Sequence, residues 1–135
     1  MSATLVDSNV LIDVLSRDPE WIEWSGAAVR RMGAAGPLVI NEMIYAEVSA
    51  RYARIEALER VLPADYFQRE YTPWPAAFLA GKAFVDYRRR GGRRSSPLPD
   101  FFIGAHAAVA GLKLLTRDPT RFRTYFPTIE LITPG

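Results

Sequence analysis

The feature that most constrains the fold is an alternation of short, unbroken apolar runs with longer segments of helical periodicity. The runs lack the alternation of polar and apolar residues that marks a strand with one solvent-exposed face, so they are typical of strands buried on both faces. Buried strands separated by helices form parallel sheets with right-handed crossovers. The pattern therefore predicts an α/β fold whose central parallel sheet is covered by helices on both faces, with strands at 4–6, 38–40, 70–72, 112–116 and 129–132.

Helices are predicted between these runs, where apolar residues recur every three or four positions. Capping residues, prolines and glycines set their ends. The predicted helices run from Ser8 to Leu15, Pro19 to Met32, Asn41 to about Val61, Ala76 to about Arg89, Pro99 or Asp100 to about Ala110, and Pro119 to Tyr125. The chain has 135 residues without a repeat or a linker, so we expect a single domain over 1–135.

Composition excludes several kinds of chemistry. The chain has no Cys and one His, which excludes disulfide frameworks, iron–sulfur clusters and thiolate zinc sites. We interpret His106 as a core histidine. The net charge of +2 excludes a uniformly basic nucleic-acid platform. No segment resembles a signal peptide or is long enough to span a membrane, so a soluble, cytoplasmic protein is expected.

The remaining candidates for chemistry are carboxylates, and three of them share one kind of position. Asp7 follows the first predicted strand, Asp118 follows the fourth, and Asp100 begins an apolar helix. Parallel sheets bind ligands in the crevice beyond the carboxyl ends of their strands. Each Asp taken singly is also a good helix N-cap, and that alternative stays open.

Glu47 is a fourth candidate, because it lies beside an apolar helix face where an unpaired carboxylate is costly to bury. A structural pair with Arg51, four residues later, is the alternative. Several carboxylates in one crevice would repel one another unless a cation joined them. Oxygen ligands suit Mg²⁺ or Mn²⁺, and the matching chemistry is attack of water on a phosphodiester.

Four sequence blocks resemble the PIN-domain nucleases, in particular the VapC-type toxins of toxin–antitoxin modules. In the first block a strand leads into Asp7-Ser8-Asn9, where the family commonly has Thr in the middle position. In the second and third blocks, Glu47 lies within a long helix and Asp100 begins an apolar helix. In the fourth block a strand leads into Thr116-Arg117-Asp118. The resemblance implies an acidic metal site for Mg²⁺ or Mn²⁺ made by Asp7, Glu47, Asp100 and Asp118, supported by Asn9 and Thr116. It also implies a homodimer and inhibition by a small antitoxin, for which apolar surface on the first two helices is a candidate groove.

The leading hypothesis is a metal-dependent endoribonuclease that acts as a toxin on RNA. A housekeeping RNA-processing nuclease, a non-catalytic PIN-like binding module and a phosphatase or receiver phosphorylated on Asp7 are the alternatives. An arginine-rich segment is a candidate contact for the RNA backbone, and a solvated helix end is the competing interpretation. Its members are Arg88, Arg89, Arg90, Arg93 and Arg94.

Overall fold

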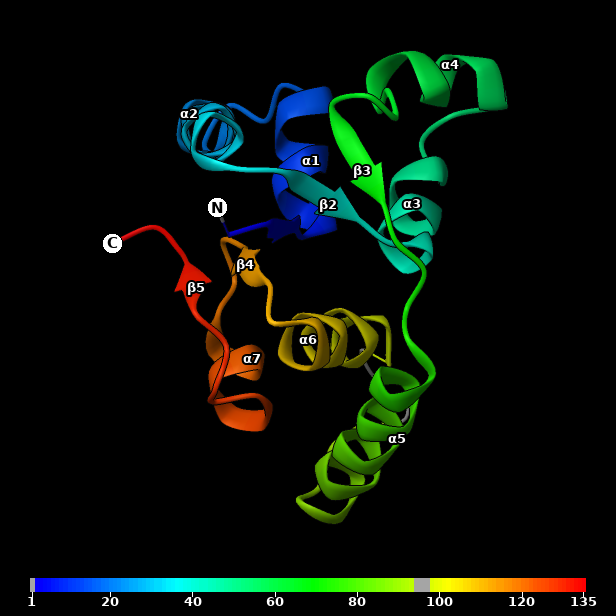
Figure 1. Cartoon of the computed structure of the whole chain (residues 1–135), viewed down its shortest axis with the longest axis vertical. Helices are drawn as coiled ribbons and strands as arrows, with labels where there is room; N and C mark the ends of the chain where they lie inside the picture. Colours follow the sequence, from blue (N-terminus) through cyan, green and yellow to red (C-terminus); the bar gives the residue numbers. More distant parts are fainter. Residues whose placement is uncertain (1, 94–97) are drawn as a thin grey trace.

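A five-stranded parallel sheet forms the centre of the computed structural model (Figure 1), which describes residues 2–93 and 98–135. The strand order is β3-β2-β1-β4-β5, and every neighbouring pair is parallel. The central strands β1 and β2 are wholly buried, as their unbroken apolar runs predict. The strands are β1 (Thr4–Val6), β2 (Leu38–Ile40), β3 (Phe67–Arg69), β4 (Lys113–Leu115) and β5 (Leu131–Ile132).

Helices cover both faces of the sheet, which confirms the predicted α/β architecture. The connections from β1 to β2 and from β2 to β3 cross the sheet in one direction, and those leading to β4 and β5 cross it in the other. Right-handed crossovers therefore place the two sets on opposite faces, as Figure 1 shows. One set is α1 (Ser8–Leu15), α2 (Ile22–Ala35), α3 (Glu42–Ser49) and α4 (Ile55–Val61); the other is α5 (Trp74–Arg89), α6 (Leu98–Ala110) and α7 (Thr120–Tyr125).

The strand order reverses between β1 and β4, which are neighbours in the sheet. The chain leaves β1 toward α1 on one face, and it leaves β4 toward α7 on the other. The backbone N–H of Asp7 donates to the carbonyl of Leu115 at 2.9 Å, so the ends of the two strands lie side by side. In open α/β sheets a crevice forms where the connections diverge in this way.

The single long helix predicted from Asn41 to about Val61 is wrong, because the chain forms α3 and α4 with a break between them. At the break the N–H groups of Arg51 and Tyr52 donate to carbonyls only three residues back, at 3.1 and 3.0 Å. Ile55, which the predicted apolar stripe included, is 63% exposed. The segment contains neither Pro nor Gly, so no local signal marked the break.

Other element boundaries also differ from the prediction. Helix α2 spans Ile22–Ala35 rather than Pro19 to Met32, because Asp18 Oδ1 accepts the N–H groups of Glu20 and Trp21 in a turn that precedes the helix. Helix α5 begins at Trp74 rather than Ala76, with Pro75 in its first turn. The third strand lies at Phe67–Arg69 rather than at 70–72, since Phe67 is buried and pairs with Leu38. Helix α6 begins at Leu98, so Asp100 lies in its first turn. Helix α7 has Pro119, not Asp118, at its N-cap.

Aromatic packing joins the helices of the second face. Phe101 of α6 is fully buried and contacts Tyr87, Tyr125 and Phe126 edge-on or tilted. A Cβ on Gly104 would lie 2.4 Å from the Phe126 ring, so α6 and the chain after α7 approach closely there. Among the described helices none is long and apolar enough to cross a membrane.

Candidate active site

A pocket of about 510 Å³ opens at the carboxyl edge of the sheet, where β1 and β4 end. The four predicted carboxylates line it together: Asp7 after β1, Glu47 from α3, Asp100 from α6 and Asp118 from the loop after β4. One helix from each face and the segments that follow β1 and β4 thus bring acids from distant parts of the chain to one place. The rest of the lining comes from Ser8, Asn9 and α7, including Arg121 and Tyr125.

Asp7 is the most buried of the four acids, with 3% of its surface exposed. Its Oδ2 accepts a hydrogen bond from the Thr116 hydroxyl at 2.8 Å. Burial raises the pKa of Asp7 to about 7; the Thr116 hydrogen bond opposes this, and the negative charges of Asp100 and Glu47 add to it. Asp7 occupies the N-cap position of α1, but its side chain makes no capping hydrogen bond to that helix.

Glu47 points toward the start of α1. Its Oε1 accepts a hydrogen bond from the Ser8 hydroxyl at 2.7 Å. Burial raises the pKa of Glu47, the Ser8 hydrogen bond opposes the rise, and the charge of Asp100 adds to it. The alternative pairing with Arg51 is wrong, because no ion pair joins the two within the described ranges.

Asp100 is the one acid of the four with a cationic partner in the described structure. Arg121 of α7 donates from Nη1 to Asp100 Oδ2 at 2.7 Å. Burial raises the pKa of Asp100, the Arg121 guanidinium opposes the rise, and Asp118 adds to it. Arg121 also lies over the Tyr87 ring at 5.7 Å, which ties it to α5.

The loop after β4 is held to α1 through Thr116. The Thr116 Oγ1 donates to Asp7 and accepts from Asn9 Nδ2 at 3.3 Å and from the Asp118 N–H at 3.1 Å. Asn9 Oδ1 in turn receives the Arg117 N–H at 3.5 Å. Thr116 therefore bonds the Asp7 carboxylate directly, and Asn9 is connected to that carboxylate through the Thr116 hydroxyl.

Two residues of the pocket were missed by the sequence reasoning. Ser8 was considered only as a replacement for Thr in the opening block, yet its hydroxyl orients Glu47. Arg121 had no signal in the sequence, since its partner Asp100 is 21 positions away in the chain and on another helix. Only the three-dimensional structure brings either pair together.

His106 lies in the core, as predicted, with 0% exposure. Asn41 Oδ1 accepts from the Ile44 N–H at 2.9 Å and caps α3, which leaves Asn41 Nδ2 facing His106 Nδ1 at 3.1 Å. The amide then donates to Nδ1, so the imidazole proton is on Nε2. Burial lowers the pKa of His106, and the nearby Glu70 carboxylate opposes this.

One member of the arginine-rich segment, Arg90, contacts a residue that lines the pocket. Arg88 and Arg89 end α5, and all of Arg88, Arg89, Arg90 and Arg93 are exposed, whereas Arg94 lies outside the described residues. Arg90 pairs with Asp86 at 3.1 Å and lies over the ring of Tyr125 at 5.4 Å. Since Tyr125 lines the acidic pocket, this end of α5 forms part of its rim.

The donor chemistry of the pocket suits a hard divalent ion. Carboxylate oxygens are the ligands that Mg²⁺ and Mn²⁺ prefer. Burial is the main cause of the raised pKa of Asp7, and the charges of Asp100 and Glu47, which a cation would offset, add to it. Within the part of the chain that the structure describes, no three acidic or His side chains are placed to hold one ion together. Mg²⁺ needs fewer, because it keeps several waters and is commonly bound by one or two carboxylates.

Comparisons with known proteins agree with this architecture. A family model described as "PIN domain" matches residues 4–126. No curated protein sequence matches the chain.

Three solved structures illustrate the shared fold. VapBC2 from Rickettsia felis, bound to a DNA fragment from its promoter, has a TM-score of 0.73 at 13% identity, covering 97% of this chain and 98% of that chain. VapBC-1 from nontypeable Haemophilus influenzae has a TM-score of 0.72 at 17% identity and covers 97% of both chains. A toxin–antitoxin complex from Klebsiella pneumoniae has a TM-score of 0.64 at 23% identity and covers 98% of both.

Proposed function

Since the chain belongs to the PIN domain family, we propose that it is a divalent-metal-dependent endoribonuclease and the toxin of a toxin–antitoxin pair. The observation that carries the proposal is the pocket in which Asp7, Glu47, Asp100 and Asp118 meet at the carboxyl edge of the sheet. A cluster of carboxylates with raised pKa values is suited to binding a cation. It is poorly suited to binding a phosphate without one, because like charges repel.

The four acids are the candidate ligands of Mg²⁺ or Mn²⁺ and the proposed catalytic residues; one or two of them would bind the ion directly, and the others would bind it through its waters. When bound, such an ion activates water for attack on a phosphodiester and offsets the charge that develops on the phosphate. Thr116 and Asn9 orient the Asp7 carboxylate, and Ser8 orients that of Glu47. Arg121 pairs with Asp100; if Asp100 held the ion, the Arg121 guanidinium would be available to bind an RNA phosphate.

The proposed RNA contact is the rim formed by the end of α5. Arg88, Arg89, Arg90 and Arg93 are exposed there, with Arg94 following in the sequence. Arginine pairs well with phosphate, and such binding weakens as salt is added. Replacing all five arginines by Gln should flatten the dependence of RNA affinity on salt concentration. An unchanged slope would show that the segment is a solvated helix end.

The proposed antitoxin site is an apolar groove of about 390 Å³ between α1, α2 and α4. Leu11, Val14 and Val29 are among its apolar lining residues, and Arg30 and Arg60 lie beside them. An amphipathic partner helix with acidic residues along its edges would fit this combination. The groove favours a toxin over a housekeeping nuclease, as does the similarity of the fold to VapBC2, VapBC-1 and the Klebsiella pneumoniae toxin–antitoxin complex.

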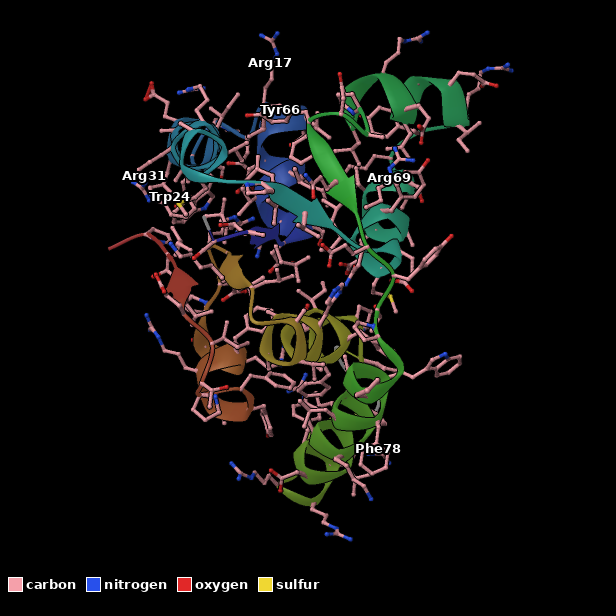
Figure 2. All side chains as sticks on the ribbon, viewed as in Figure 1. Arg17, Trp24, Arg31, Tyr66, Arg69 and Phe78 are labelled. Atoms are coloured by element: carbon pink, nitrogen blue, oxygen red, sulfur yellow. The ribbon has the colours of Figure 1, made fainter. Side chains whose placement is uncertain are left out.

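A homodimer is proposed from the outer face of α5. Trp74 is 89% exposed, Phe78 is 68% exposed and Val85 is 45% exposed on this one helix. Figure 2 shows Phe78 on α5, pointing away from the rest of the molecule. Exposed aromatic patches of this kind are typical of protein interfaces. We place the protein in the cytoplasm, where its proposed RNA substrate is.

The test is RNA cleavage by the purified protein after removal of metal with EDTA. Activity should return with Mg²⁺ or Mn²⁺ and should be lost in each of Asp7→Ala, Glu47→Ala, Asp100→Ala and Asp118→Ala. Asp65→Ala, at an exposed acid outside the pocket, is the matched control and should keep full activity. Full activity in EDTA or in the four variants would overturn the proposal. Growth arrest on induction, relieved by a co-expressed antitoxin, would establish the toxin role.

A further inference from the structure

A second buried carboxylate on α1 lies outside the acidic pocket. Asp13 is 1% exposed, and both of its oxygens are engaged by a single guanidinium. Arg117 donates from Nε to Asp13 Oδ2 at 2.7 Å and from Nη2 to Asp13 Oδ1 at 3.1 Å. Oδ2 also accepts the Ser25 hydroxyl at 2.8 Å. This is the bidentate geometry in which an arginine–carboxylate pair is strongest and most directional.

The pair is the outer of two attachments between α1 and the loop that follows β4. Asn9 and Asp13 are four residues apart, so they share one face of α1. Asn9 contacts the loop through Thr116 Oγ1 and the Arg117 N–H, and Asp13 contacts it through the Arg117 side chain. Arg117 also lies over the Trp21 ring at 5.3 Å, which limits the directions its side chain can take.

The loop carries Asp118, whose carboxylate accepts no hydrogen bond from another side chain or N–H group in residues 2–93 and 98–135. The position of that carboxylate therefore depends on its backbone. The Asp118 N–H donates to Thr116 Oγ1, and the residue between them is Arg117. Contacts that fix Arg117 therefore also fix the backbone of Asp118, the next residue.

We infer that Arg117 is a positioning residue, which uses Asp13 as a fixed anchor to hold Asp118 and Thr116 in the geometry that a bound divalent ion requires. The inference rests on the proposed function, because it assigns a purpose to the loop of that same pocket. Displacements of about 1 Å in a catalytic constellation can cost about 100-fold in rate. A lysine in place of Arg117 would keep the positive charge but could not make the bidentate hydrogen bond to Asp13.

The experiment compares Arg117→Lys with Ser25→Ala in the full chain. Both variants remove a hydrogen bond to the buried Asp13, but only Arg117 lies in the loop. We expect Mn²⁺ affinity, measured by titration calorimetry with the metal alone, to fall at least about 10-fold in Arg117→Lys and to stay within about 2-fold of wild type in Ser25→Ala. Equal Mn²⁺ affinity in the two variants would overturn the inference.

A metal-free measurement separates this inference from the proposed function. Amide hydrogen exchange at Thr116–Asp118 in EDTA should accelerate in Arg117→Lys and stay at the wild-type rate in Ser25→Ala. Unchanged exchange in Arg117→Lys overturns the inference whatever the metal does, whereas a wild-type protein that neither binds Mn²⁺ nor cleaves RNA overturns the proposed function. If Arg117→Lys does not fold, the double variant Asp13→Asn with Arg117→Gln removes both charges together. Faster amide exchange at Thr116–Asp118 in the double variant would then support the inference, and unchanged exchange would overturn it.

Discussion

Replacing Asp7 by Asn should stabilise the metal-free protein at pH 8. The pKa of Asp7 is about 7 in the fold and 3.8 in the reference state that represents the unfolded chain. A difference of one pH unit corresponds to about 1.4 kcal/mol. Ionised Asp7 therefore destabilises the fold by about 4 kcal/mol once the pH is well above 7.

The sign follows from which state holds the proton. Below pH 3.8 Asp7 is protonated in both states and has no effect on the free energy of unfolding. As the pH rises from 3.8 to about 7 the unfolded state loses its proton first, so the wild-type protein progressively loses stability; above that range the loss is constant. Asn cannot ionise, and its carbonyl oxygen can still accept the Thr116 hydroxyl. The stability advantage of Asp7→Asn should therefore grow with pH.

The assay is urea unfolding in EDTA at pH 4, 6 and 8, for wild type, Asp7→Asn and the control Asp65→Asn at an exposed acid. The Asp7→Asn advantage should be near zero at pH 4 and should reach a few kcal/mol at pH 8, a figure that already includes the relief of repulsion with Asp100 and Glu47. The control should stay within about 0.5 kcal/mol of wild type at each pH. An Asp7→Asn protein no more stable than wild type at pH 8 would refute the reasoning.

Three further predictions follow from the same structure. Mg²⁺ or Mn²⁺ at about 100 times its dissociation constant should add about 2.7 kcal/mol to the free energy of unfolding. The rise in Tm that the metal causes should be smaller at pH 5.5, because Asp7 must ionise to bind the ion. Ser8→Ala removes a charge-assisted hydrogen bond of 2.7 Å to Glu47, so it should raise the pKa of Glu47 and lower the free energy of unfolding by about 1 kcal/mol. It should also weaken Mn²⁺ binding in titration calorimetry. Gly104→Ala should cost about 1–3 kcal/mol in urea unfolding because its Cβ would meet Phe126 at 2.4 Å. Gly81→Ala, on α5 with nothing within 4 Å of the added Cβ, should instead add about 0.5–1 kcal/mol to the free energy of unfolding. A gain in stability at both glycines would show that α6 and Phe126 are not in close contact at Gly104.

The parallel sheet and the positions of Asp7 and Asp118 at its carboxyl edge could be predicted because both depend on local signals, whereas the resemblance to the family added Glu47 and Asp100 to the same site. A buried strand is recognised by its unbroken apolar run, and an acid directly after it lies at the carboxyl edge wherever the strand stands in the sheet. The position of Asp7 and Asp118 beside each other follows once β1 and β4 are neighbours. The sequence predicted only that both acids lie at this edge, and the strand order makes them neighbours.

The break between α3 and α4 and the residues of β3 could not be predicted, because long-range packing sets them. Phe67 enters the core through its pairing with Leu38, a contact that outweighs the stronger strand propensity of the segment after it. Side-chain partners were equally inaccessible. Arg117 and Asp13 are 104 positions apart, and nothing in the sequence pattern joins them.

The most direct test of the central claim is analysis of the RNA ends formed by the wild-type protein with Mg²⁺ in ¹⁸O-labelled water. Attack of water on the phosphodiester predicts a linear phosphate end with one labelled oxygen, produced by wild type and by Asp65→Asn but not by Asp7→Asn. A 2′,3′-cyclic phosphate end would show that the ribose hydroxyl is the nucleophile. That result, or cleavage that persists in EDTA, would contradict the assignment of the acidic pocket as a metal-dependent nuclease site.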